Sequence, residues 1–188
     1  MFFNKRYNTI NYFHKKFETA MKHLFFAAII LFVTIGAKAQ SDKNLAPYQK
    51  DSMLPTFSIL ETDSSTWFNS GDIPKNKSVI IVYFNPECGH CQLTAHEFQE
   101  KMDAFKDDFF IWVSFNKSMT EIRDFAVQYK LVDAKNVRIG RDTKYFIPTF
   151  FKLTYTPYIA VYNEQGKLLE TYDGGTDTDT LIDLLHKY

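Results

Sequence analysis

The chain has 188 residues, of which 45% are hydrophobic and 23% are charged, values that are typical of one folded domain with an appendage. Its formal net charge is zero, but residues 1–39 hold six of the 22 basic side chains and one of the 22 acidic ones. Residues 40–188 therefore carry an excess of acidic groups, which argues against nucleic acid as a partner, because a polyanion is bound through clustered positive charge.

The first 39 residues have the composition of a targeting segment. A basic start precedes the mostly apolar run 24–35, and Ala37-Lys38-Ala39 supplies the small residues that a signal peptidase requires. We predict a secretory signal peptide over residues 1–39 and a periplasmic or otherwise extracytoplasmic protein. An uncleaved membrane anchor is the alternative, although the run is shorter than the roughly 20 apolar residues of a membrane span. Residues 1–20 do not resemble a signal sequence, so translation from Met21 is a second alternative to the full length.

The segments after the signal peptide alternate between strand and helix patterns. Residues 40–54 are polar and aperiodic, which predicts a linker, and residues 55–188 form the predicted domain. The expected elements are an edge strand at 57–60, buried strands at 79–84 and 109–115, a helix after each of these two, a hairpin of strands at 158–162 and 167–172, and a C-terminal helix. Parallel strands linked by helices and followed by a hairpin predict an α/β fold, a mixed sheet with helices on both faces.

Local signals support several of these elements. Residues 79–84 are an unbroken run of β-branched and aromatic side chains, which is typical of a strand buried on both faces. Ser118 and Glu121 have the spacing of a capping box at the start of a helix. The aromatic run 145–151 is predicted to lie in the core rather than at a ligand surface, and Pro148 argues against a long helix there.

The chain has two cysteines, and they occupy the tetrad Cys88-Gly89-His90-Cys91 between a predicted strand and a predicted helix. At a helix N-terminus, unpaired backbone N–H groups and the helix dipole favour a thiolate over a thiol. We therefore predict a redox pair in which Cys88 attacks a disulfide and Cys91, one turn later, resolves the mixed disulfide. His90 and Glu87 are predicted to tune the thiolate in opposite directions, because one stabilises negative charge and the other repels it.

Other interpretations of the cysteine pair stay open. A structural disulfide fits an exported protein, although closing so short a loop stabilises little. His90 and His96 are the nearest further metal ligands, but their spacing matches no zinc pattern, so no metal and no cofactor are predicted. His90 is alternatively a plain solvated residue. These alternatives correspond to a binding module with a structural disulfide or to a metal-delivery protein.

The order of a strand, a CGHC tetrad, a helix, and later Thr156-Pro157 before a hairpin resembles the thioredoxin superfamily. The nearest subgroup is that of the exported redoxins, which include bacterial periplasmic thiol–disulfide oxidoreductases, and the CGHC tetrad is similar to that of protein disulfide isomerase. The resemblance implies an enzyme that exchanges protein thiols and disulfides and is recycled by a redox partner. It also implies that Pro157 is a cis-proline and that the backbone of Thr156 binds a substrate peptide.

The sequence departs from the classical thioredoxin pattern at two positions. Glu87 stands where a tryptophan usually precedes the first cysteine, and Val82 stands where a buried aspartate usually accepts the proton of the second. The base that assists Cys91 is therefore left open. A peroxidase of this fold would carry Thr or Ser three residues before Cys88, where this chain has Asn85.

Overall fold

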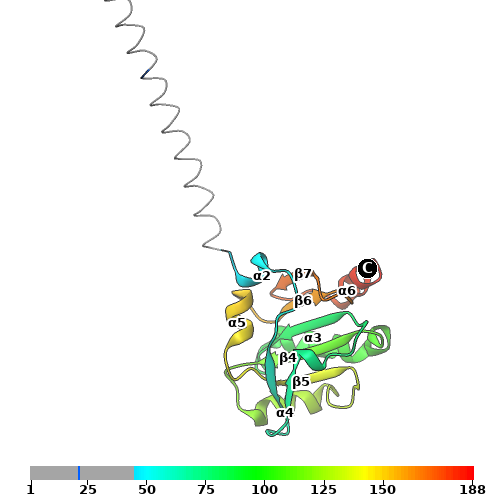
Figure 1. Ribbon diagram of the computed structural model, residues 1–188. Helices are drawn as coiled ribbons and strands as arrows, with labels where there is room; N and C mark the ends of the chain where they lie inside the picture. The colour runs from blue at the N-terminus through cyan, green and yellow to red at the C-terminus, as the bar shows by residue number, and fades with distance from the viewer. Residues whose placement is uncertain (1–20, 22–44) are drawn as a thin grey trace, which may run out of the picture. The chain divides into compact units, whose positions relative to one another are not determined.

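The computed structural model in Figure 1 describes Met21 and residues 45–188. Residues 46–188 form one compact unit, which contains the sheet and helices described below. The predicted signal peptide and the apolar run within it lie outside the described residues. In the part of the chain that the structure describes, every helix is too short or too polar to cross a membrane.

A mixed seven-stranded sheet forms the centre of residues 46–188, and its strand order is β2-β1-β5-β4-β3-β6-β7. The strands are β1 (Ser58–Glu61), β2 (Trp67–Asn69), β3 (Val79–Tyr83), β4 (Phe109–Ser114), β5 (Val137–Arg141), β6 (Tyr158–Tyr162) and β7 (Leu168–Asp173). β3, β4 and β5 are parallel, whereas the other neighbouring pairs are antiparallel. The predicted mixed sheet and its C-terminal hairpin are confirmed.

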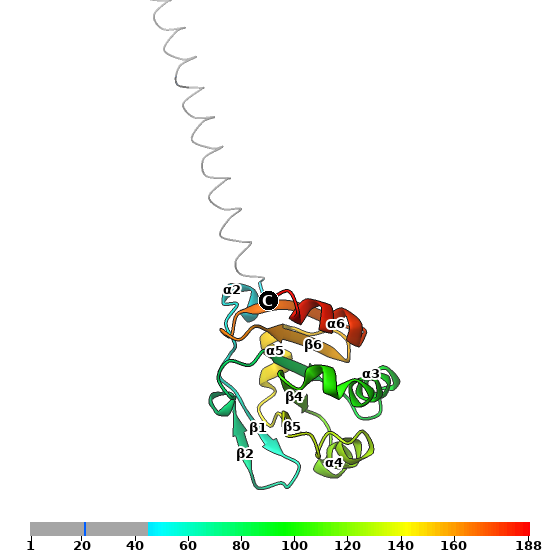
Figure 2. The same ribbon diagram turned by 90° about the vertical axis from the view of Figure 1, so that its right-hand side faces the viewer.

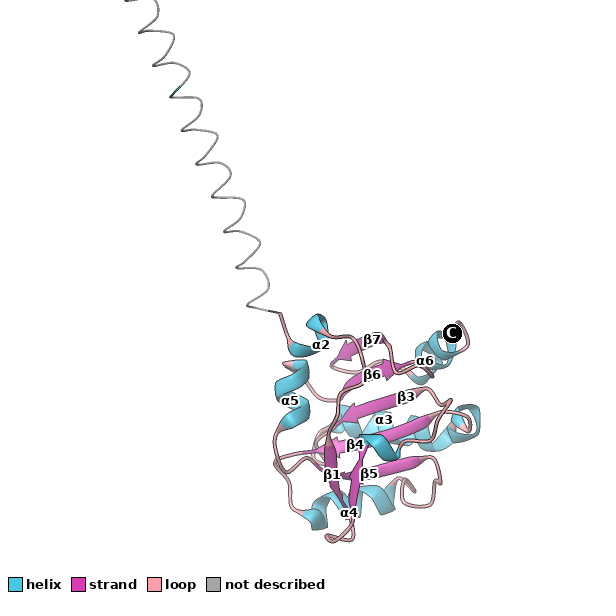
Figure 3. Ribbon diagram, viewed as in Figure 1, coloured by secondary structure: helices cyan, strands magenta, loops and turns pink. Residues whose placement is uncertain are grey.

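Helices cover both faces of this sheet (Figures 2 and 3). The α-helices are α2 (Pro47–Lys50), α3 (Gly89–Glu100), α4 (Met119–Gln128), α5 (Phe146–Phe151) and α6 (Thr178–Leu185), and short 3-10 helices span Ser70–Asp72 and Met102–Phe105. Buried residues of α3, α4 and α6 share one hydrophobic core, whereas those of α5 belong to a second core, against which Tyr48 of α2 packs. The predicted capping box is confirmed at the start of α4, where Ser118 and Glu121 bond reciprocally.

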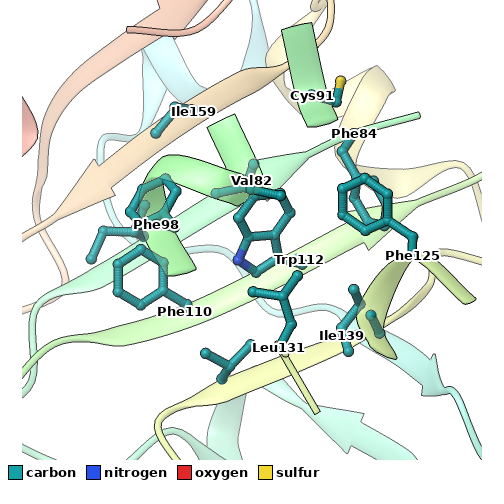
Figure 4. Packing of buried hydrophobic residues seen from close by; sticks show 14 of the residues in the cluster. Val82, Phe84, Cys91, Phe98, Phe110, Trp112, Phe125, Leu131, Ile139 and Ile159 are labelled. Atoms are coloured by element: carbon teal, nitrogen blue, oxygen red, sulfur yellow. The ribbon is translucent and has the colours of Figure 1, made fainter. Parts of the chain in front are cut away.

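Alternation along the central strands divides the core into these two layers. In β3, Ile80 and Val82 belong to the layer under α3, whereas Val79 and Ile81 belong to the layer under α5. Trp112 of β4 lies in the middle of the first layer, where its ring stands 5.7 Å from that of Phe98 (Figure 4). Because both faces are covered, the strands read as continuous apolar runs.

Two expectations about the elements need correction. The strand predicted at 57–60 is not an edge strand, because β2 pairs with its outer side. β5 was missed, because two arginines and Gly140 interrupt its apolar pattern. Glycine is required there by close packing, since a Cβ on Gly140 would stand 2.3 Å from the carbonyl oxygen of Leu60. In the aromatic run 145–151, Ile147 and Phe151 lie in the core as predicted, whereas Tyr145 is exposed. The helix there has only six residues, as Pro148 leads us to expect.

Residues 46–54 are not the loose linker that the sequence predicts. Ala46 is buried, and the ring of Tyr48 stands 5.4 Å from that of Phe151. The Leu54 N–H donates to the Gly166 carbonyl at 2.7 Å. Because these contacts are made by backbone groups and one ring, the polar composition of the segment gives no sign of them. The folded unit therefore begins at Ala46.

Candidate active site

The two cysteines lie where the central strand β3 gives way to helix α3. The Cys88 N–H donates to the Asn85 carbonyl at 3.0 Å, which closes a turn and places Cys88 at the N-cap of α3. Cys88 is half-buried, whereas Cys91, one turn along the helix, is fully buried in the core with Ala95 and Phe98. Both are free thiols.

Their surroundings move the pKa values of the two thiols in opposite directions. Burial raises the pKa of Cys88, but hydrogen bonds from the thiol and backbone of Cys91, from the Thr156 side chain and from the His90 backbone lower it, and the net pKa falls below its ordinary value of 9.0. Burial raises the pKa of Cys91 to about 12, and the neighbouring Cys88 sulfur adds to this rise. Cys88 is therefore the thiol that ionises more readily.

The loop before β6 brings Thr156 and Pro157 against Cys88, although 68 residues separate Thr156 from it. The Cys88 thiol donates to the Thr156 carbonyl oxygen at 3.4 Å. The Thr156–Pro157 peptide bond is cis, as the family resemblance implies. The structure thus assembles the predicted cysteine pair and the predicted substrate-binding residues into one site.

The two predicted tuning residues lie in different surroundings. The Glu87 carboxylate forms an ion pair with Lys117, whose ammonium also stands 3.6 Å from Glu121. Lys117 was missed by sequence reasoning, because it lies 30 residues from Glu87 and no local pattern links them. His90 is exposed and borders a shallow groove of about 320 Å³. The groove is lined by His90, Leu93, Thr94, Glu97, Gly174, Gly175, Thr176 and Asp177.

Val82 occupies the position at which the classical thioredoxin pattern has a buried aspartate. Val82 is fully buried and its isopropyl group cannot accept a proton, so it does not serve as the base for Cys91 (Figure 4).

His96 lies on the exposed side of α3, where its Nε2 stands 3.6 Å from the Glu100 carboxylate. Within residues 45–188, no three side chains of the metal-ligating types gather into a cluster that could hold an ion.

The strand order, the helices on both faces and the position of α3 define a thioredoxin-like fold. A family model described as a thioredoxin-like domain matches residues 73–188. The chain therefore belongs to the thioredoxin-like family. A protein disulfide-isomerase from Datisca glomerata is 24% identical over 162 residues, which are 86% of this chain and 27% of that protein. The chain thus spans about a quarter of the length of that relative.

Several solved structures share the fold. A secreted disulfide oxidoreductase from Mycobacterium tuberculosis superposes with a TM-score of 0.59 at 16% identity, over 70% of this chain and 96% of that one. The thioredoxin domain of a thiol-disulfide oxidoreductase from Bacteroides vulgatus gives 0.60 at 15% identity, over 76% and 96%. An exposed lipoprotein thioredoxin from Streptococcus pneumoniae gives 0.56 at 22% identity, over 71% and 100%.

Proposed function

We propose that this protein is a thiol–disulfide oxidoreductase that acts on protein disulfides outside the cytoplasm through a redox pair of Cys88 and Cys91. One observation carries the proposal. The half-buried Cys88 thiol has a lowered pKa at the N-terminus of α3, and the Cys91 thiol is buried one turn away with a pKa of about 12. A readily ionised thiol beside a protected second thiol is the arrangement that thiol–disulfide exchange uses.

The pair exchanges two electrons with its substrate in two displacement steps. In the reducing direction, the Cys88 thiolate attacks one sulfur of a substrate disulfide, and the other substrate sulfur leaves as a thiolate that takes up a proton. Cys91 then loses its proton and attacks the Cys88 sulfur, which expels the second substrate sulfur and forms the Cys88–Cys91 disulfide. The same steps in reverse oxidise a substrate dithiol. No cofactor takes part in either direction.

Thr156 and Pro157 are proposed to bind the substrate chain beside the reacting sulfur. The Thr156 carbonyl lies against Cys88, and an extended peptide that pairs with this backbone brings its own disulfide to the same point. The ion pair with Lys117 offsets the negative charge of Glu87, so Glu87 should repel the Cys88 thiolate less strongly than an unpaired carboxylate would. The backbone N–H of His90 lowers the pKa of Cys88, and the tuning predicted for its imidazole is proposed to add to this effect.

The proposed location is the periplasm or another extracytoplasmic compartment, as the predicted signal peptide of residues 1–39 implies. A secreted disulfide oxidoreductase of similar fold supports this location. The proposed partners are protein thiols and disulfides, together with a redox protein that returns the pair to its working state. Membrane contact is expected only where the signal segment stays uncleaved.

Trapping of mixed disulfides tests the assignment of the two thiols. Cys91→Ser leaves the attacking thiol without its resolving partner, so this variant is expected to accumulate a mixed disulfide with a disulfide-containing substrate such as insulin, whose other sulfur leaves as a thiol. Cys88→Ser is expected to trap none. The wild-type protein should catalyse the reduction of insulin by a dithiol. The reduction potential of the Cys88–Cys91 pair, measured at equilibrium with glutathione, indicates the direction of electron flow. Absence of catalysis by the wild type would refute the proposed enzyme and favour the alternative of a binding module with a structural disulfide.

A further inference from the structure

The end of strand β7 contacts the loop that borders Cys88. The carboxylate of Asp173 accepts the Tyr155 N–H at 2.7 Å and the Thr154 N–H at 3.1 Å. These two residues immediately precede Thr156, whose carbonyl lies 3.4 Å from the Cys88 sulfur. One exposed side chain thus fixes two consecutive backbone groups just before the predicted substrate-binding residues.

The two glycines that follow Asp173 contact the other end of the same loop. The Gly174 N–H donates to the Pro157 carbonyl at 3.1 Å. Gly175 has a φ of +89°, and a Cβ added there would stand 2.8 Å from Cγ of Pro157. Residues 173–175 therefore hold the segment 154–157 at both ends, and close contact with the proline ring is compatible with glycine but not with a larger residue.

We propose that Asp173 is a positioning residue of the redox site, which fixes the backbone of Thr154 and Tyr155 so that Thr156 stands against Cys88 and is presented to a bound peptide. The inference rests on the proposed function, because it concerns the binding of a peptide disulfide at that same site. Asp173 contacts neither sulfur, so it acts through the loop. A loop that is already ordered loses less conformational entropy when a substrate pairs with it.

The test compares a peptide disulfide with a small disulfide that has no peptide backbone to pair with the loop. Insulin and 2-hydroxyethyl disulfide are suitable probes, and kcat and KM are measured for each with the full-length protein. Asp173→Ala is expected to raise KM for insulin by about 5- to 30-fold, the range that follows from losing two hydrogen bonds to a charged group. Its kcat for insulin and both constants for 2-hydroxyethyl disulfide are expected to change less than about twofold.

Three further variants separate positioning from charge and from general stability. Asp173→Asn keeps the Oδ1 atom, which accepts the Tyr155 N–H at 2.7 Å and the Thr154 N–H at 3.2 Å, and loses only the acceptor at Oδ2, so it should restore most of the wild-type KM. Glu170→Ala is the control, because it removes an exposed acidic group from the same strand and should leave KM unchanged. The hydrogen bond that the Glu170 carboxylate accepts comes from the neighbouring Thr171 N–H. Gly175→Ala disturbs the loop from the Pro157 side and should reproduce the rise in KM, which keeps the inference testable where Asp173→Ala folds poorly.

The outcomes distinguish this inference from the proposed function. A wild-type protein without disulfide turnover refutes both. An active wild type refutes the inference alone in three cases. The first is a folded Asp173→Ala that keeps the wild-type KM, or, where that variant does not fold, a Gly175→Ala that keeps it. The others are a KM that rises equally for 2-hydroxyethyl disulfide and an asparagine variant that behaves like the alanine variant. A rise in KM confined to insulin and reversed by asparagine supports it.

Discussion

Replacing one cysteine at a time exposes the reactivity of the other, because an alkylating agent such as iodoacetamide reacts with the thiolate and not with the thiol. In Cys91→Ser, the serine hydroxyl can still donate to the Cys88 sulfur, so the lowered pKa of Cys88 is largely kept. In Cys88→Ser, burial still holds the pKa of Cys91 high, because burial is the largest cause of its rise. The two variants therefore report the two environments separately.

The structure gives the size of the expected difference. A pKa of about 12 for Cys91 leaves about one thiolate in 10⁴ molecules at pH 8, since the ionised fraction falls tenfold per pH unit. The pKa of Cys88 lies below 9.0, which gives a thiolate fraction above about one in ten at the same pH. The ionised fractions thus differ by at least about 10³-fold, and the greater nucleophilicity of the thiolate with the higher pKa offsets about 30-fold of this difference. Cys91→Ser should therefore be alkylated at least about 30 times faster than Cys88→Ser, and burial of the Cys91 sulfur widens the gap.

The assay follows the alkylation rate of each variant by mass spectrometry between pH 5 and pH 10. For Cys91→Ser, the rise of the rate with pH should have its midpoint below pH 9, whereas for Cys88→Ser the rate should still rise tenfold per unit at pH 10. Circular dichroism confirms that both variants are folded. Equal rates at pH 8, or a midpoint for Cys88 above 9, would refute the assignment of Cys88 as the attacking thiol.

Four further predictions concern other residues of the domain. His90→Pro removes the backbone N–H that lowers the pKa of Cys88, so it should raise that pKa and make the disulfide less oxidising, whereas His90→Ala keeps the N–H and should show only the smaller charge effect predicted for the imidazole. Phe98→Ala empties a fully buried site and should lower the free energy of unfolding by about 3–5 kcal/mol in urea titrations. Ser118→Ala removes the N-cap of α4 and should cost about 1 kcal/mol in the same measurement. Burial and the charge of Asp107 raise the pKa of Asp108 to about 6, so the folded state binds its proton more tightly and stability should fall as pH rises from 4 to 6; Asp108→Asn should flatten this fall.

Elements with local signals could be predicted from the sequence, and elements held by distant contacts could not. The apolar run of β3 and the capping box of α4 are each complete within a few residues. β5 has two buried side chains in alternation, Val137 and Ile139, and it becomes a strand because β4 and β1 supply hydrogen bonds on either side. β2 spans three residues, too few for a periodic pattern to be recognised.

The same division applies to the site. The cysteine pair follows from its position between a strand and a helix, and the role of Thr156 follows from the family resemblance. Lys117 and Asp173 have no such signal, because each acts on a segment 18 to 30 residues away through a side chain whose neighbours are set by the fold. Charged residues at the ends of strands are common, and the sequence alone does not show which of them face a functional loop.

The pairing of residues 52–54 with the start of β7 bears on how the domain avoids association with other chains. β7 is the last strand of the sheet, and an uncovered edge strand offers its free backbone groups to any extended neighbour. The Leu168 N–H donates to the Ser52 carbonyl at 2.7 Å, and Met53 forms a bridge with Lys167, so the beginning of this edge is already occupied. A chain cut at residue 55 would lose this cover and present an open template for sheet extension, whereas a chain that begins at Ala46 carries its own protection.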